Sequence, residues 1–304
     1  MRGKRFALLC GIVVAVGATA FWWLTRPEAF DAAALPVRTA NAENGRTVFF
    51  AGGCSSCHAT PGQDDVTRLG GGLALKSPFG TFHVPNISSD RRDGIGAWTE
   101  GQFLTAMTKG VSPAGEHYYP AFPYTTYQHA KVEDLRDLFA YLRTLPAAQG
   151  RAPAHELPFP FTVRRGIGLW KRLYMDARVE TAKAGTPEIA RGAYLVNALG
   201  HCAECHSPRD MFGGIRDAQR FAGGPNPEGE GWVPNITQAA LGNWSTDDFV
   251  DLLTSGASPE GGKVAGAMAA VVRNTAQLPA ADRAAIAAYV KSLPPVTGPK
   301  PPVK

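Results

Sequence analysis

The sequence CSSCH occupies residues 54–58, and a second string of the same form, CAECH, occupies residues 202–206. Both read C-x-x-C-H, the attachment signature of a c-type haem. The spacing follows from the chemistry, because two thiols one helical turn apart share a helix face and can add to the two vinyl groups at one porphyrin edge. The histidine that follows can then bind the iron from below. The two strings therefore predict two covalently bound haem c groups.

Other uses of these cysteines fit the pattern less well. A redox disulfide would not require histidine after the second cysteine in both strings, and a four-cysteine zinc site would leave both histidines unused. The fifth cysteine, Cys10, lies in an apolar run and is expected to be inert. The predicted thioether donors are Cys54, Cys57, Cys202 and Cys205, and the predicted proximal ligands are His58 and His206.

Length and composition indicate a globular protein of about two domains. The chain has 304 residues, of which 44% are hydrophobic, so it can bury substantial cores. The net charge of +5 is spread without a long basic run, and no nucleic-acid recognition motif is present. We therefore expect no nucleic-acid partner.

The N-terminal segment predicts export. Residues 6–24 carry no charge and follow basic residues at positions 2, 4 and 5. A helix of that length spans about 28 Å, enough for a bilayer core with the N-terminus in the cytoplasm. Residues 1–25 are read as a membrane anchor, favoured by their length and by Trp22 and Trp23, or as a signal peptide cleaved after residues 18–20 (ATA). The anchored reading places the rest on the periplasmic side of the bacterial inner membrane, whereas a cleaved chain would lie free in the periplasm.

The segments after the two strings resemble each other, which indicates a duplicated unit. VPNI occurs at 84–87 and at 233–236, and GVSP at 110–113 is echoed by GASP at 256–259. Each half closes with an amphipathic run that ends at a proline. We therefore predict a mainly α fold. The first helices are expected at 44–50 and 187–199, the closing helices at 132–145 and 279–293, the domains at 40–146 and 186–295, a connector at 147–185 and a flexible tail at 296–304.

The two halves differ where a distal haem ligand is expected. Met268 follows Gly256 at a distance suitable for a thioether ligand, which would raise the haem potential. Phe122 stands at the same distance after Gly110 and cannot bind iron. The first haem is then either five-coordinate or bound by another side chain, and the candidates are His129, Met107, His117 and His83, with His155 and His201 weaker. A bis-His or open haem has the lower potential, so we expect electrons to pass from the first haem to the second.

Several further strings carry a family resemblance. They are KSPFGT at 76–81, GIGAWT at 94–99, YPAFPY at 119–124, FPF at 159–161, RGAYL at 191–195 and CHSPR at 205–209. In combination with VPNI they resemble the multihaem cytochrome c subunits of bacterial membrane-bound alcohol and gluconate dehydrogenases. The chain departs from them in having two haem strings instead of the usual three, and Phe122 where many have a ligating methionine.

The resemblance implies two class I cytochrome c domains in tandem and the transfer of electrons. The implied donor is a periplasmic dehydrogenase, and the acceptor is a small cytochrome, a quinone or a terminal oxidase. It also implies that the Pro208 carbonyl orients the proximal histidine and that Arg209 pairs with a haem propionate. The alternative is an enzyme, a peroxidase or small-molecule oxidoreductase, that acts at an open first haem with His117 or Glu116 as distal acid–base group. A gas or redox sensor is a third hypothesis. The sequence shows no attached signalling domain, which counts against it.

Overall fold

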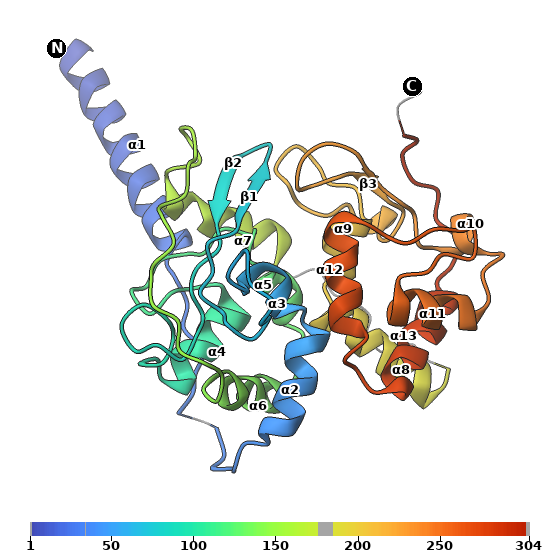
Figure 1. Ribbon diagram of the computed structural model, residues 1–304. Helices are drawn as coiled ribbons and strands as arrows, with labels where there is room; N and C mark the ends of the chain where they lie inside the picture. Colours follow the sequence, from blue (N-terminus) through green and yellow to red (C-terminus); the bar gives the residue numbers. More distant parts are fainter. Residues whose placement is uncertain (1, 34, 176–184, 302–304) are drawn as a thin grey trace.

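The computed structural model describes residues 2–33, 35–175 and 185–301, and it is mainly helical, as predicted. Two helical domains lie side by side, and a long N-terminal helix projects from the first (Figure 1). The first domain is built from α2 (Ala42–Ala51), α3 (Cys54–His58), β1 (Ala74–Ser77), β2 (Gly80–His83), α4 (Glu100–Lys109), α5 (Tyr124–Tyr127) and α6 (Val132–Leu142). The second is built from α8 (Pro187–Tyr194), η2 (Leu195–Leu199), α9 (Cys202–His206), η3 (Asp217–Gln219), β3 (Gly224–Pro225), β4 (Trp232–Val233), α10 (Gln238–Leu241), α11 (Thr246–Ser255), α12 (Gly266–Thr275) and α13 (Ala280–Ser292).

The sequence repeat corresponds in the structure to helices that begin and end in the same way. Helices α4 and α11 each begin with a capping box, at Thr99 and Ser245, in which the N-cap side chain and the residue three positions on bond each other's backbone N–H groups. Both helices end at a glycine in the left-handed region, Gly110 with φ 58° and Gly256 with φ 77°. The two VPNI-containing loops precede these helices, so the same local signals build the same framework twice.

In each domain the first helix crosses the closing helix at a glycine. A Cβ on Gly45 of α2 would lie 2.0 Å from the carbonyl oxygen of Asp137 on α6. A Cβ on Gly192 of α8 would lie 1.9 Å from the carbonyl oxygen of Ala285 on α13. No side chain fits at these distances, so glycine lets the two helices approach backbone to backbone.

The apolar core of the first domain continues into the second. Its members include Phe49 and Leu104 from the first half, and also Leu195, Leu199 and other residues from the second half. A smaller cluster around Phe221 and Phe249 serves the second half alone. The two halves therefore share an apolar interface and are not independent units.

Two antiparallel hairpins supplement the helices and were not anticipated from the sequence. In the first, β1 pairs with β2, with Leu75 opposite Phe82. In the second, β3 pairs with β4, with Gly224 opposite Val233. Each hairpin follows the haem string of its own half and leads into the VPNI string, and the strands are too short to give an alternating apolar pattern.

The chain after each closing helix is fastened by the asparagine of VPNI. The Asn86 side chain donates to the carbonyl oxygen of Ala148 at 2.6 Å, and Asn235 donates to Val296 at 2.8 Å. The Val296 N–H also donates to Thr237 Oγ1 at 3.1 Å. The first residues of the predicted tail, Val296 and Thr297, are therefore bonded to the second domain, while residues 302–304 lie outside the described residues.

The connector contacts both domains before it reaches residues 176–184, which lie outside the described residues. It contains η1 (Arg164–Gly166) and α7 (Ile167–Tyr174). Lys171 Nζ donates to the carbonyl oxygen of Gly110 at 2.7 Å in the first domain, and Tyr174 Oη donates to Asp210 at 2.7 Å in the second. The described part of the connector therefore contacts both domains.

The N-terminal helix α1 (Arg2–Leu24) has a mean hydropathy of 2.1 over its most apolar part and is not buried by the rest of the chain. It is long and apolar enough to cross a membrane.

Candidate haem sites

The two haem strings form matching one-turn helices, α3 and α9. Each helix is preceded by a residue in the left-handed region, Gly53 with φ 60° and His201 with φ 40°. This turn ends the preceding helix, α2 or η2, and starts the new helix in another direction. The same backbone path therefore presents both pairs of cysteines.

Each predicted proximal histidine is held by a proline carbonyl. His58 Nδ1 lies 2.9 Å from the Pro85 oxygen, and His206 Nδ1 lies 2.8 Å from the Pro234 oxygen. Because a carbonyl oxygen can only accept, Nδ1 carries the proton in both rings and Nε2 keeps its lone pair. This is the arrangement of a metal-binding histidine oriented by a hydrogen bond behind it.

Burial keeps both imidazoles neutral. It lowers the pKa of His58 to about 4, against the Pro85 hydrogen bond, which raises it. It also lowers the pKa of His206. At neutral pH both rings are therefore uncharged donors, as iron ligation requires.

The proline that orients His206 is not the one that we predicted. His206 Nδ1 bonds to the Pro234 oxygen, and the Pro208 carbonyl accepts from the Arg216 N–H at 2.9 Å, so the role implied for Pro208 is wrong. The oxygen of Pro234, the second residue of the repeated VPNI string, accepts the hydrogen bond from His206, as the oxygen of Pro85 does from His58. The repeat itself was the signal that could have identified both prolines.

The four string cysteines are free and half-buried, so none of them is used in a disulfide. Burial raises the pKa of Cys54 and Cys205 to about 12 and that of Cys57 and Cys202 to about 11. Within residues 2–33, 35–175 and 185–301, no three His, Cys, Asp or Glu side chains are grouped to hold a metal ion by themselves. The donor set, two thiols and one neutral imidazole, fits a haem c.

The predicted distal ligand Met268 lies near the start of α12, half-buried, and stays a prediction. It belongs to neither apolar cluster of the described chain. Its counterpart Phe122 packs in the first core, with its ring 5.7 Å from that of Tyr118 and 5.9 Å from that of Tyr127.

The candidates for the first distal position differ in how their polar atoms are used. His117 Nε2 donates to the carbonyl oxygen of Thr25 at 2.9 Å, and His83 Nε2 pairs with Glu156 at 2.9 Å. Met107 is 6% exposed within the first core. His129 Nε2 is buried and has no hydrogen-bond partner among the described residues. Of His83, His117 and His129, only His129 has an Nε2 without a hydrogen-bond partner among the described residues, and both His129 and Met107 remain predictions.

Arg209 is bound within its own loop. Its Nη2 donates to the Glu204 carboxylate and carbonyl, both at 2.6 Å, and Nη1 donates to the Gly213 carbonyl at 2.6 Å. Its Nε is buried without a partner among the described residues, and so is that of Arg220. The predicted pairing of Arg209 with a propionate stays a prediction, and Arg220 is a second candidate that sequence reasoning missed.

Comparison with known proteins shows which family the chain belongs to. The cytochrome c family model matches residues 42–146 and again residues 189–294. The chain therefore belongs to the cytochrome c family, with two such domains in tandem. This confirms the predicted fold class.

Curated relatives extend the match to the whole chain. A "Diheme cytochrome c-type" protein of Cereibacter sphaeroides is 47% identical over 294 residues, covering 95% of this chain and 99% of that protein. The fructose dehydrogenase cytochrome subunit of Gluconobacter japonicus is 36% identical over 264 residues, covering 82% of this chain and 52% of that subunit. A nicotinate dehydrogenase subunit of Pseudomonas putida is 37% identical over 253 residues, covering 83% of this chain and 21% of that much longer protein.

Cytochrome c subunits of quinone-dependent alcohol dehydrogenase and of gluconate 2-dehydrogenase match as well, which confirms the resemblance stated from the sequence. The chain spans about half the length of these subunits or less, but nearly all of the dihaem protein. The two domains and the dihaem relative together support two haem c groups and a function in electron transfer.

Proposed function

We propose that the protein is a membrane-anchored dihaem cytochrome c of the periplasm. It relays single electrons from a periplasmic dehydrogenase to a downstream cytochrome, quinone or oxidase. The observation that carries this proposal is the matched pair of attachment helices, each with a neutral histidine oriented by the carbonyl of Pro85 or Pro234. A bound haem would supply reversible one-electron chemistry, and the chain would hold the group, exclude water and tune its potential.

Covalent attachment is tested by intact mass. Protein produced together with a haem-attachment system is expected to carry the added mass of two haems. Replacing Cys202 and Cys205 by alanine is expected to leave one, and the matched change at Cys54 and Cys57 to leave the other. A wild-type mass with one haem or none would refute the proposal.

The relay itself is tested by potentiometry. We expect two one-electron steps, with the second haem at the higher potential because Met268 stands where the first half has Phe122. Rapid reduction by a periplasmic dehydrogenase, followed by oxidation by a small cytochrome, is the expected behaviour. A first haem with the higher potential would contradict the proposed order.

The end of α1 supports a retained anchor. Arg165 Nη2 donates to the carbonyl oxygen of Trp22 at 2.7 Å, and Arg172 Nε donates to that of Leu24 at 2.7 Å. These donors, with His117 at Thr25, satisfy carbonyls that a helix leaves unpaired at its C-terminus. The possible cleavage site at 18–20 lies inside this continuous helix. We therefore infer that the helix passes directly from the membrane into the first domain.

The anchor is tested in membranes. The protein is expected to remain in the membrane fraction after carbonate washing, with the N-terminal residues present by mass spectrometry. A mature protein that begins after residue 20 would show instead that α1 is an export signal.

The dehydrogenase partner is proposed from the relatives. Nicotinate, fructose, alcohol and gluconate dehydrogenases each contain a subunit similar to this chain. The enzyme alternative finds less support, because His117, its proposed distal acid–base group, is hydrogen-bonded to Thr25 at the end of α1. Rapid binding of cyanide or carbon monoxide by the first haem would favour the enzyme, and low-spin, six-coordinate spectra for both haems would favour the relay.

A further inference from the structure

The two attachment helices lie against each other's domain through the residues between their cysteines. Ser55 Oγ donates to Asn274 Oδ1 at 2.8 Å, and Asn274 Nδ2 donates to Ser56 Oγ at 2.9 Å. In the other direction, Thr125 Oγ1 donates to the Glu204 carboxylate at 2.8 Å. In both strings, therefore, at least one residue between the two cysteines is hydrogen-bonded to the other domain.

One contact joins the two strings most directly. His201, the residue before Cys202, places its Nε2 3.2 Å from the carbonyl oxygen of Gly52, two residues before Cys54. Because that oxygen can only accept, Nε2 carries the proton and donates it. Tyr127 Oη donates to the same oxygen at 3.1 Å from within the first domain. A path from Cys202 through His201 and Gly52 to Cys54 therefore consists of covalent bonds and one hydrogen bond.

The backbone conformation of His201 is unusual for a residue that has a Cβ atom. Its φ of 40° lies in the left-handed region, and the equivalent residue of the first half is Gly53, with φ 60°. Glycine adopts this conformation without strain, whereas a residue with a Cβ does not, although histidine is found there more often than most. A strained residue persists where its side chain is needed. In the second half that side chain makes the bond to Gly52.

We propose that His201 is a positioning residue for electron transfer between the two haems, and that its hydrogen bond to Gly52 is the link between the two attachment strings. The inference rests on the proposed relay, because it requires a haem on each string. The step moves one electron: one iron is oxidised, the other is reduced, no bond breaks and no proton is transferred.

The test uses the full-length protein with both haems. The His201→Gly variant removes the link and also relieves the backbone strain, and Gly52 keeps its bond from Tyr127. We expect its unfolding temperature to be equal to or above that of the wild type. We expect both midpoint potentials to stay unchanged, and the rate of electron transfer between the haems after photoreduction to fall severalfold. His201→Gln keeps a side-chain N–H donor and is expected to recover most of the rate.

Two control variants separate the link from domain packing. Tyr127→Phe removes the other hydrogen bond to Gly52 without crossing between domains, and is expected to leave the rate unchanged. Asn274→Ala removes the bonds to Ser55 and Ser56 but not the His201 link. A wild-type rate in His201→Gly, or an equal loss of rate in Asn274→Ala, would overturn the inference. A protein with fewer than two haems would instead refute the proposed function.

Discussion

Individual hydrogen bonds set the chemistry of the two sites. The oxygens of Pro85 and Pro234 decide which nitrogen of His58 and His206 carries the proton, and hence which one can bind iron. The sequence predicts these histidines from the strings alone. The role that the family resemblance implied for Pro208 is filled instead by Pro234, on a loop that returns to His206.

Met268 is the residue whose replacement is expected to change the ligation of one haem most and to leave the other haem unaltered. Met268→Leu preserves size but cannot bind iron, so we expect the second haem to become high-spin, to bind carbon monoxide and to lose potential. Electron paramagnetic resonance of the oxidised protein measures this change. Met211→Leu is the matched control, since Met211 is 82% exposed, and it is expected to leave the spectrum unaltered. A low-spin second haem in Met268→Leu would remove this residue from the ligand set.

At the scale of elements, the helix crossings predict a steric effect. Gly192→Ala places a methyl group against the Ala285 carbonyl, so α8 and α13 must separate. We expect a loss of about 1–3 kcal/mol in the free energy of unfolding, the usual cost of overpacking. Gly166→Ala is the control, because a Cβ there meets nothing within 4 Å and its φ of −59° suits alanine. Equal stabilities of the two variants in denaturant titration would contradict the backbone contact.

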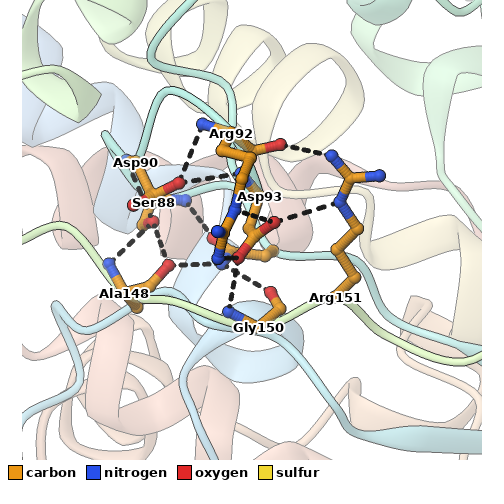
Figure 2. Close-up of polar contacts among 8 residues, drawn as sticks. Ser88, Asp90, Arg92, Asp93, Ala148, Gly150 and Arg151 are labelled. Atoms are coloured by element: carbon orange, nitrogen blue, oxygen red, sulfur yellow. Dashed lines mark hydrogen bonds and ion pairs between the residues drawn. The ribbon is translucent and has the colours of Figure 1, made fainter.

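A second element-scale feature is the clamp between the loop at 88–93 and the chain after α6, shown in Figure 2. Asp93 accepts from Arg92 Nη2 at 3.0 Å, from the Gly150 N–H at 3.0 Å and from Arg151 Nε at 3.1 Å. The hydrogen bonds from Arg92 and then Gly150 hold the pKa of Asp93 well below its usual range. The loop and the segment after α6 are therefore tied by a group that stays charged in mild acid.

The clamp predicts a pH dependence. A carboxyl whose pKa is lower in the folded than in the unfolded state stabilises fully above about pH 4 and loses that contribution as the pH falls further. We expect Asp93→Asn to unfold at a lower temperature than the wild type at neutral pH, and the difference to shrink in acid. Thermal unfolding across this pH range measures it. A difference that stays constant into acid would show that the charge of Asp93 does not contribute.

At the scale of the whole molecule, α1 is separable from the rest. It is not buried by the rest of the chain, so replacing residues 1–20 with a cleavable export signal is expected to leave the unfolding temperature and both haems unchanged. Membrane association is expected to be lost. Fractionation and intact mass check both outcomes, and persistent membrane binding would reveal a second membrane-contacting surface.

The sequence predicts the duplicated framework well, because capping residues, VPNI and the haem strings are local signals. It does not predict how the copies meet. The bonds of His201, Asn274 and Glu204 join residues far apart in the chain, and no local pattern encodes them. The same holds for Val296, whose N–H donates to Thr237 Oγ1 from an earlier loop.

The apolar core that runs from Phe49 into Leu195 and Leu199 has a further consequence. Separating the halves would expose apolar surface on both, so we expect neither half to be stable alone. Heat is then expected to melt the pair in one cooperative transition, with the absorbance of both prosthetic groups changing together. The shared core thus predicts that the two halves fold and unfold as one unit.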